Sequence, residues 1–126
     1  MKEIERMSIE SPIEVVQRQL NAYNAKDMEA WLSTYAVNAK QTTLHGELIA
    51  QGHEEMRSRI ISRFSEPDLA ARLLSRTVMN NIVVDFEVVT RNFPEGPGTI
   101  EKICIYEVVN GLIQNASFAL GQAKFT

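Results

Sequence analysis

Two turn signals, each next to long apolar segments, set the strongest limit on how the second half of the chain folds. Asn110-Gly111 follows an apolar segment at 100–109, and Asn-Gly is the dipeptide most typical of a two-residue β-hairpin. Asn80-Asn81 separates a segment at 73–79 from one at 82–90, and asparagine tolerates the positive φ that such turns need. Two hairpins in succession predict a mainly antiparallel sheet of long strands.

The first half of the chain has the periodicity of helices instead. Ser11-Pro12-Ile13-Glu14 is a capping-box pattern that predicts a helix start, Asp27 caps a second, shorter helix, and a third follows Gly52. Residues 38–50 are predicted to form two short strands between the second and third helices. The apolar side chains expected to be buried are Ile9, Ile13, Val16, Leu20 and Tyr23 in the first helix, Met28, Trp31, Leu32 and Tyr35 in the second, and Met56, Ile60, Ile61 and Phe64 in the third.

Composition and charge limit the class of protein. A chain of 126 residues fits one domain, which we place at 11–126 after an N-terminal extension at 1–10. Its net charge of −3 argues against nucleic acid as a partner, because binding phosphates requires a basic face. The single cysteine, Cys104, excludes an intrachain disulfide and a multi-cysteine metal site. The sequence contains neither a signal-peptide pattern nor a membrane span, so we predict a cytoplasmic protein that does not bind membranes.

Alternation along the last hairpin predicts which side chains share a face of the sheet. Regular pairing outward from the turn places Tyr106 opposite Asn115 and Cys104 opposite Ser117, on the face toward the helices. The other face is apolar too, and three helices can cover only one face, so we predict a homodimer through it. The alternative is a monomer, in which the polar side chains of Glu101, Glu107 and Gln114 allow that face to be exposed to solvent. The predicted dimer residues are Ile103, Ile105, Ala116 and Phe118.

The preceding hairpin is predicted to pair Ser75 with Phe86 and Arg76 with Asp85. We expect Ser75 and Phe86 on the helix-covered face, and Asp85 with Glu87 on the outer face, where Arg76 and Asp85 form a structural ion pair. Small or polar residues on the covered face leave room beneath the helices, and this predicts a cavity for a small molecule. The arginines of the third helix, Arg57, Arg59 and Arg63, are predicted to form a solvated face.

Four segments, taken in order, resemble the nuclear transport factor 2-like superfamily. They are VVQRQLNAYNAKD at 15–27, YAVNA at 35–39, QGHEEMR at 51–57 and IYEVVNGLI at 105–113. Within this superfamily the sequence resembles the small bacterial SnoaL-like proteins, some of them labelled steroid Δ-isomerase. This resemblance implies an α+β cone, in which a three-helix layer packs on a strongly curved antiparallel sheet.

The superfamily includes ketosteroid isomerase, which uses an aspartate base together with a tyrosine and a protonated carboxylic acid that hold an oxyanion. Aligned on residues 15–18, these three positions fall on Thr43, Gln19 and Cys104 respectively. A threonine cannot act as a base near neutral pH, and glutamine does not donate a hydrogen bond as a phenol does. The resemblance therefore implies the fold, while the residues argue against steroid isomerase chemistry.

Three hypotheses about function remain open. The first is a pocket for a small hydrophobic or aromatic molecule, with no cofactor, no metal and no assigned catalytic residue. The second is an isomerase, cyclase or dehydratase that uses Tyr106, Asn115, Gln19 and Tyr23, and the third is a non-catalytic module that dimerises or docks on another protein. The predicted ligand-binding residues are Gln19, Tyr23, Trp31, Tyr35, Thr43, Phe64, Ser75, Phe86, Cys104, Tyr106, Asn115 and Ser117.

Overall fold

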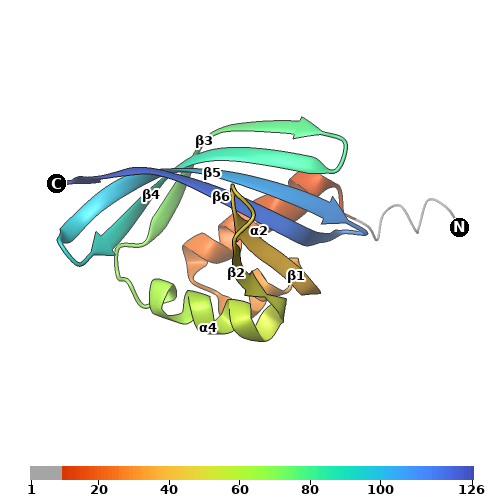
Figure 1. Ribbon diagram of the computed structural model, residues 1–126, viewed down its shortest axis with the longest axis horizontal. Coiled ribbons are helices and arrows are strands. Elements are labelled where there is room, and N and C mark those ends of the chain that lie inside the picture. The colour runs from red at the N-terminus through yellow and green to blue at the C-terminus, as the bar shows by residue number, and fades with distance from the viewer. Residues whose placement is uncertain (1–9) are drawn as a thin grey trace, which may run out of the picture.

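The first part of the chain forms the predicted helices in the computed structural model, which describes residues 10–126 (Figure 1). Helix α2 (Pro12–Ala25) begins at the expected capping box, in which the Ser11 and Glu14 side chains each accept a hydrogen bond from the other residue's backbone N–H. Asp27 caps α3 (Met28–Leu32), and α4 spans Gly52–Phe64. The first nine residues of the predicted extension, Ile9 among them, lie outside the described residues.

A single curved sheet follows, with the strand order β2-β1-β6-β5-β4-β3 within residues 10–126. Neighbouring strands are antiparallel except for β1 and β6, which are parallel and join the first strand to the last hairpin. Figure 1 shows the helices on one side of the sheet, which we call its inner face; the other side is its outer face. The strands are β1 (Tyr35–Thr43), β2 (Leu48–Gln51), β3 (Ala70–Met79), β4 (Ile82–Phe93), β5 (Gly96–Val109) and β6 (Leu112–Phe125).

The core lies between the helices and the inner face, with Val15, Trp31 and Met56 among its fully buried side chains. Two of the side chains predicted to be buried are not, because Ile13 and Ile61 are 45% and 60% exposed. Within residues 10–126, no helix is both long enough and apolar enough to cross a membrane. The predicted α+β cone of three helices on a curved sheet is confirmed for this part of the chain.

A β-bulge in β6 changes the face on which its side chains lie. Val108 pairs with Ile113 as predicted, but Glu107 pairs with Asn115, so Gln114 is an extra residue on one strand. The Gln114 side chain donates a hydrogen bond to Asn38 at 3.0 Å, on the neighbouring strand β1. Because side chains alternate along a strand, one extra residue moves everything beyond it to the opposite face.

The bulge overturns part of the predicted pocket and part of the predicted dimer face. Ala116 and Phe118 turn to the inner face, where they are 1% and 8% exposed. Asn115 and Ser117 turn to the outer face, so they do not line the space beneath the helices. The predicted pairing of Asn115 with Tyr106 is wrong for the same reason.

The β3–β4 hairpin has the predicted register but the opposite orientation. Ser75 pairs with Phe86 and Arg76 pairs with Asp85, as expected. Asp85 and Glu87, predicted to lie outside, are 0% and 3% exposed on the inner face. Ser75 and Phe86 therefore lie on the outer face and cannot line a pocket beneath the helices.

Candidate functional site

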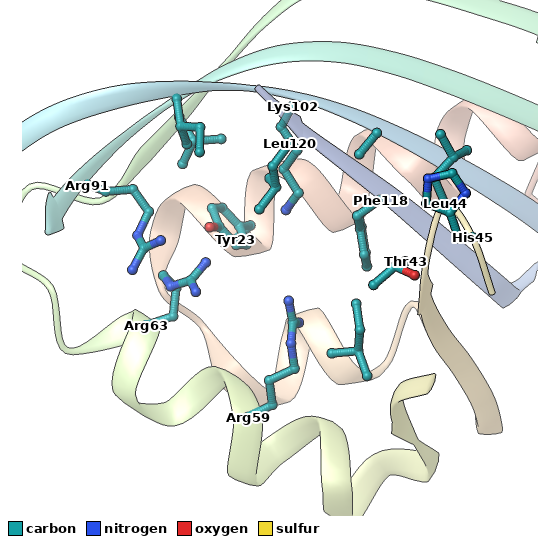
Figure 2. Close-up of a pocket in the computed structure, with 14 residues that line it drawn as sticks. Tyr23, Thr43, Leu44, His45, Arg59, Arg63, Arg91, Lys102, Phe118 and Leu120 are labelled. Atoms are coloured by element: carbon teal, nitrogen blue, oxygen red, sulfur yellow. The ribbon is translucent and has the colours of Figure 1, made fainter. Parts of the chain in front are cut away.

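A cavity of about 460 Å³ lies between the helices and the inner face of the sheet (Figure 2). Its volume is in the range of small-molecule sites, roughly 300–1,000 Å³. The side chains around it fall into an apolar set and a cationic set. The apolar set is Leu44, Ile49, Val89, Ile100, Phe118 and Leu120, and the cationic set is Arg59, Arg63, Arg91 and Lys102.

The cationic set comes from both layers of the fold. Figure 2 shows Arg59 and Arg63 extending from α4, and Arg91 and Lys102 extending from the sheet, toward the same space. The predicted solvated face of α4 is therefore wrong for Arg59 and Arg63. It holds for Arg57, which is exposed and pairs with Glu29 on α3.

One carboxylate, that of Glu66, forms ion pairs with two of these cations. The Glu66 Oε2 atom lies 2.8 Å from Arg91 Nη2 and 3.4 Å from Arg63 Nε. Burial by itself raises the pKa of the Glu66 carboxyl, but hydrogen bonds from Arg91 and the Asn92 backbone N–H lower that pKa overall. Glu66 is therefore held as an anion between two arginines.

The other two cations have no carboxylate partner within residues 10–126. The Arg59 side chain donates to Gln41 Oε1 at 3.1 Å, and its Cζ atom is 5.8 Å from the centre of the Phe118 ring. Lys102 Nζ lies 4.5 Å from the centre of the same ring and 5.8 Å from that of Tyr23. Two unpaired cations thus contact one aromatic ring at the cavity wall.

A second cavity of about 20 Å³ adjoins the first and shares Tyr23, Arg59, Arg63, Lys102 and Phe118 with it. Such a volume is enough for about one small polar group. Four buried polar atoms beside it have no hydrogen-bond partner among the described residues. They are Gln19 Oε1, the Tyr23 hydroxyl, Trp31 Nε1 and Gln41 Nε2.

Glu87 lines this small cavity and, like the cationic set, is not among the site residues predicted from the sequence. It pairs with Lys102 across β4 and β5, and the Cys104 thiol donates to its Oε1 atom at 3.7 Å. Burial raises the pKa of Glu87, although Lys102 partly offsets this effect. Burial likewise raises the pKa of Cys104 to about 12, so its thiol is an inert hydrogen-bond donor near neutral pH. An available signal was the alternation of Asp85 and Glu87 in an otherwise apolar strand.

The predicted ligand-binding residues divide into those that line one of the two cavities, those in the core and those on the outer face. Tyr23 and Thr43 line the main cavity, and Gln19, Tyr23, Trp31 and Tyr35 line the small one. Phe64, Cys104 and Tyr106 lie elsewhere in the core, where Phe64 packs on Tyr23 with ring centres 5.6 Å apart. Ser75, Phe86, Asn115 and Ser117 lie on the outer face.

The family model of the SnoaL-like domain matches residues 16–116, which is most of the chain. The chain belongs to the SnoaL-like family. None of the curated proteins compared with it matches it in sequence.

Solved structures with the same fold include several nuclear transport factor 2-like proteins. An uncharacterised cystatin-fold protein from Novosphingobium aromaticivorans aligns with a TM-score of 0.80 at 22% identity, covering 87% of this chain and 98% of its own. A nuclear transport factor 2-like protein of unknown function from Cytophaga hutchinsonii aligns at 0.73 and 14% identity, with coverages of 88% and 90%. A Mycobacterium tuberculosis protein in complex with estradiol-17β-hemisuccinate aligns at 0.73 and 19% identity, with coverages of 86% and 93%. At these identities the likeness establishes the fold.

Proposed function

We propose that this SnoaL-like protein binds a small hydrophobic or aromatic molecule in the cavity between its helices and its sheet. The observation that carries the proposal is the 460 Å³ cavity, with apolar walls and a few polar groups that converge on it. This combination is typical of small-molecule sites. The Mycobacterium tuberculosis structure, which has the same fold, contains a steroid ester, and this supports the proposal.

Filling the cavity is expected to abolish binding. Ile100 lines the cavity and is half-buried, so Ile100→Phe replaces its side chain by a larger aromatic ring that would fill part of the cavity. We expect this variant to keep its Tm and to bind apolar ligands about tenfold more weakly than wild type, or not at all. Binding can be followed by ligand-induced changes in Tm and by the fluorescence of the only tryptophan, Trp31, which lines the small cavity.

Thr99→Phe is the matched control, because Thr99 neighbours Ile100 on the same strand and points to the outer face. It should bind as wild type does. A library of steroids, aromatic polyketides and terpenoids that raises the Tm of neither wild type nor Thr99→Phe would overturn the proposed function. The non-catalytic docking module would then be the better hypothesis.

We also propose that the protein forms a homodimer through the outer face of the sheet. Ile103 and Ile105 keep their predicted place on that face, Phe86 joins them, and Ala116 and Phe118 leave it because of the bulge. Ile103 is 41% exposed, and no helix within residues 10–126 covers this side of the sheet (Figure 1). A second copy fits it well, because twofold symmetry sets the same apolar surface against itself.

Changing Ile103 to lysine is expected to convert the dimer to a monomer. Each dimer would bury two lysines in its apolar interface, and we expect the dissociation constant to rise about tenfold or more. Analytical ultracentrifugation over a range of protein concentrations measures this shift. Ile61→Lys is the control, because Ile61 is 60% exposed on α4, away from the sheet. Identical sedimentation of wild type and Ile103→Lys would contradict the proposed interface.

One observation favours an isomerase, cyclase or dehydratase as the second candidate function. Glu87 is a buried carboxyl beside the small cavity, where Gln19 and Tyr23 present unpartnered polar atoms. A carboxyl of raised pKa close to hydrogen-bonding groups can move a proton to or from a bound molecule. Tyr106 and Asn115 drop out of the catalytic set predicted from the sequence, because neither lines the main cavity or the small one. We also propose that the protein lacks steroid isomerase activity. A cytoplasmic location likewise stays a proposal.

A further inference from the structure

We propose that the ligand of the cavity is an amphipathic organic anion, with an apolar body and one carboxylate that is bound by Lys102 and Arg59. This inference rests on the proposed function, because it names the class of ligand for the same cavity. Three features of the site lead to it: the balance of charges, the position of the unpaired cations, and the separation of apolar from cationic walls.

The balance of charges leaves the cavity short of anions. Four side chains with a permanent or near-permanent positive charge line it, and Glu66 is the carboxylate that pairs with two of them, Arg63 and Arg91. The other nearby carboxyl is Glu87, and burial favours its neutral form. Lys102 and Arg59 therefore lack a full counter-charge within residues 10–126.

The unpaired cations sit where a ligand would meet them. Both lie against the Phe118 ring, Lys102 Nζ at 4.5 Å and Arg59 Cζ at 5.8 Å from its centre. One comes from the sheet and the other from α4, so they approach the cavity from opposite layers (Figure 2). Burial lowers the pKa of Arg59, and the positive charges of Arg63 and Arg91 lower it further, so Arg59 lies in a cationic part of the cavity.

Apolar side chains and arginines gather on different sides of the cavity. Figure 2 shows Leu44 and Phe118, beside the polar Thr43 and His45, on one side, and Arg63 with Arg91 on the other. A ligand with its apolar body beside Leu44 and Phe118 would bring its charged end to the middle of the cavity, into the space between Lys102 and Arg59. Charge-assisted hydrogen bonds are about twice as strong as neutral ones, and a carboxylate would supply the counter-charge that Lys102 and Arg59 lack.

Two matched probes, para-phenylbenzoate and para-phenylbenzyl alcohol, test the inference. They share an apolar body and differ in charge. Isothermal titration calorimetry on the full chain should show that the acid binds about tenfold or more tightly than the alcohol. Lys102→Gln and Arg59→Gln should each lower that ratio toward one, mainly by weakening the acid. Arg57→Gln is the control, since it removes the same charge from α4 at a residue that faces Glu29 outside the cavity.

The outcomes separate this inference from the proposed function. Equal affinity for acid and alcohol in wild type would overturn the anion inference and leave the pocket standing. A ratio unchanged in Lys102→Gln, with the folded state verified by circular dichroism, would also overturn it, even if Arg59→Gln failed to fold. Binding of neither probe, nor of a naphthalene or dodecyl pair of the same design, would overturn both the inference and the proposed function.

Discussion

Replacing Arg76 by methionine is expected to lower the free energy of unfolding by about 3–5 kcal/mol, the cost of leaving a buried charge without its partner. Asp85 is fully buried and accepts two hydrogen bonds from Arg76, at 2.7 Å from Nε and 2.9 Å from Nη2. The Arg76 Nη1 atom donates to Gln17 on α2 at 2.9 Å, so the same guanidinium also ties a helix to the edge strand. Hydrogen bonds from Arg76 to Asp85 raise the pKa of the guanidinium, which keeps Arg76 charged.

Urea denaturation measures the change, and two further variants make it specific. Arg72→Met removes an exposed arginine from the same strand and should change stability by less than about 0.5 kcal/mol. The double variant Arg76→Met with Asp85→Leu should recover most of the loss, because no unpaired charge remains. A loss below about 1 kcal/mol in Arg76→Met would show that Asp85 reaches water or another partner in solution.

The pairing of Arg76 with Asp85 could be predicted from the sequence, but its side of the sheet could not. The Asn80-Asn81 turn fixes the register, and Asn80 has the positive φ of 55° that the turn requires. The rule that apolar side chains face the core predicts that Phe86 points inward and Asp85 outward. That rule fails here, because the inner face holds the buried carboxyls of Asp85 and Glu87 between Val83 and Val89, while Phe86 faces outward.

The bulge explains the remaining errors in the last hairpin. Asn110 and Gly111 adopt the positive φ angles of 51° and 78° expected of the turn, so the pairs next to it are right. Gln114 then adds one residue, and every side chain beyond it changes face. Gln114 bonds to Asn38 on β1, a strand that joins β6 in parallel from far away in the sequence. A contact between such distant segments leaves no local signal in the sequence.

The cationic set was missed for a related reason. Helical periodicity identifies the apolar side of α4, and Met56 and Ile60 are buried there as predicted. It does not distinguish a polar side chain that faces water from one that faces a cavity. Arg59 and Arg63 border the apolar side and lie above open space, whereas Arg57 points away to α3. Only the tilt of α4 over the sheet decides between these cases.

Replacing Glu87 by glutamine is expected to stabilise the protein at neutral and alkaline pH, by about 2 kcal/mol, since an ionised buried carboxylate is costly even near a cation. Burial raises the pKa of Glu87 in the folded state. Below its pKa in the unfolded chain both states carry the proton, so variant and wild type should be equally stable. As the pH rises, the unfolded chain releases the proton first, and wild-type stability falls until the pH passes the folded pKa.

The measurement is the difference in unfolding free energy between Glu87→Gln and wild type, from about pH 4 to about pH 9, because subtraction removes the contributions of other groups. Glu101→Gln, an exposed change on β5, is the control and should give a flat difference. A flat difference for Glu87→Gln as well would mean that Lys102 fully compensates the buried carboxylate. Glu87 would then be an anion at neutral pH and could not donate a proton in the proposed isomerase, cyclase or dehydratase reaction. A rising difference would keep that function open and would leave Lys102 free to bind the carboxylate of a ligand.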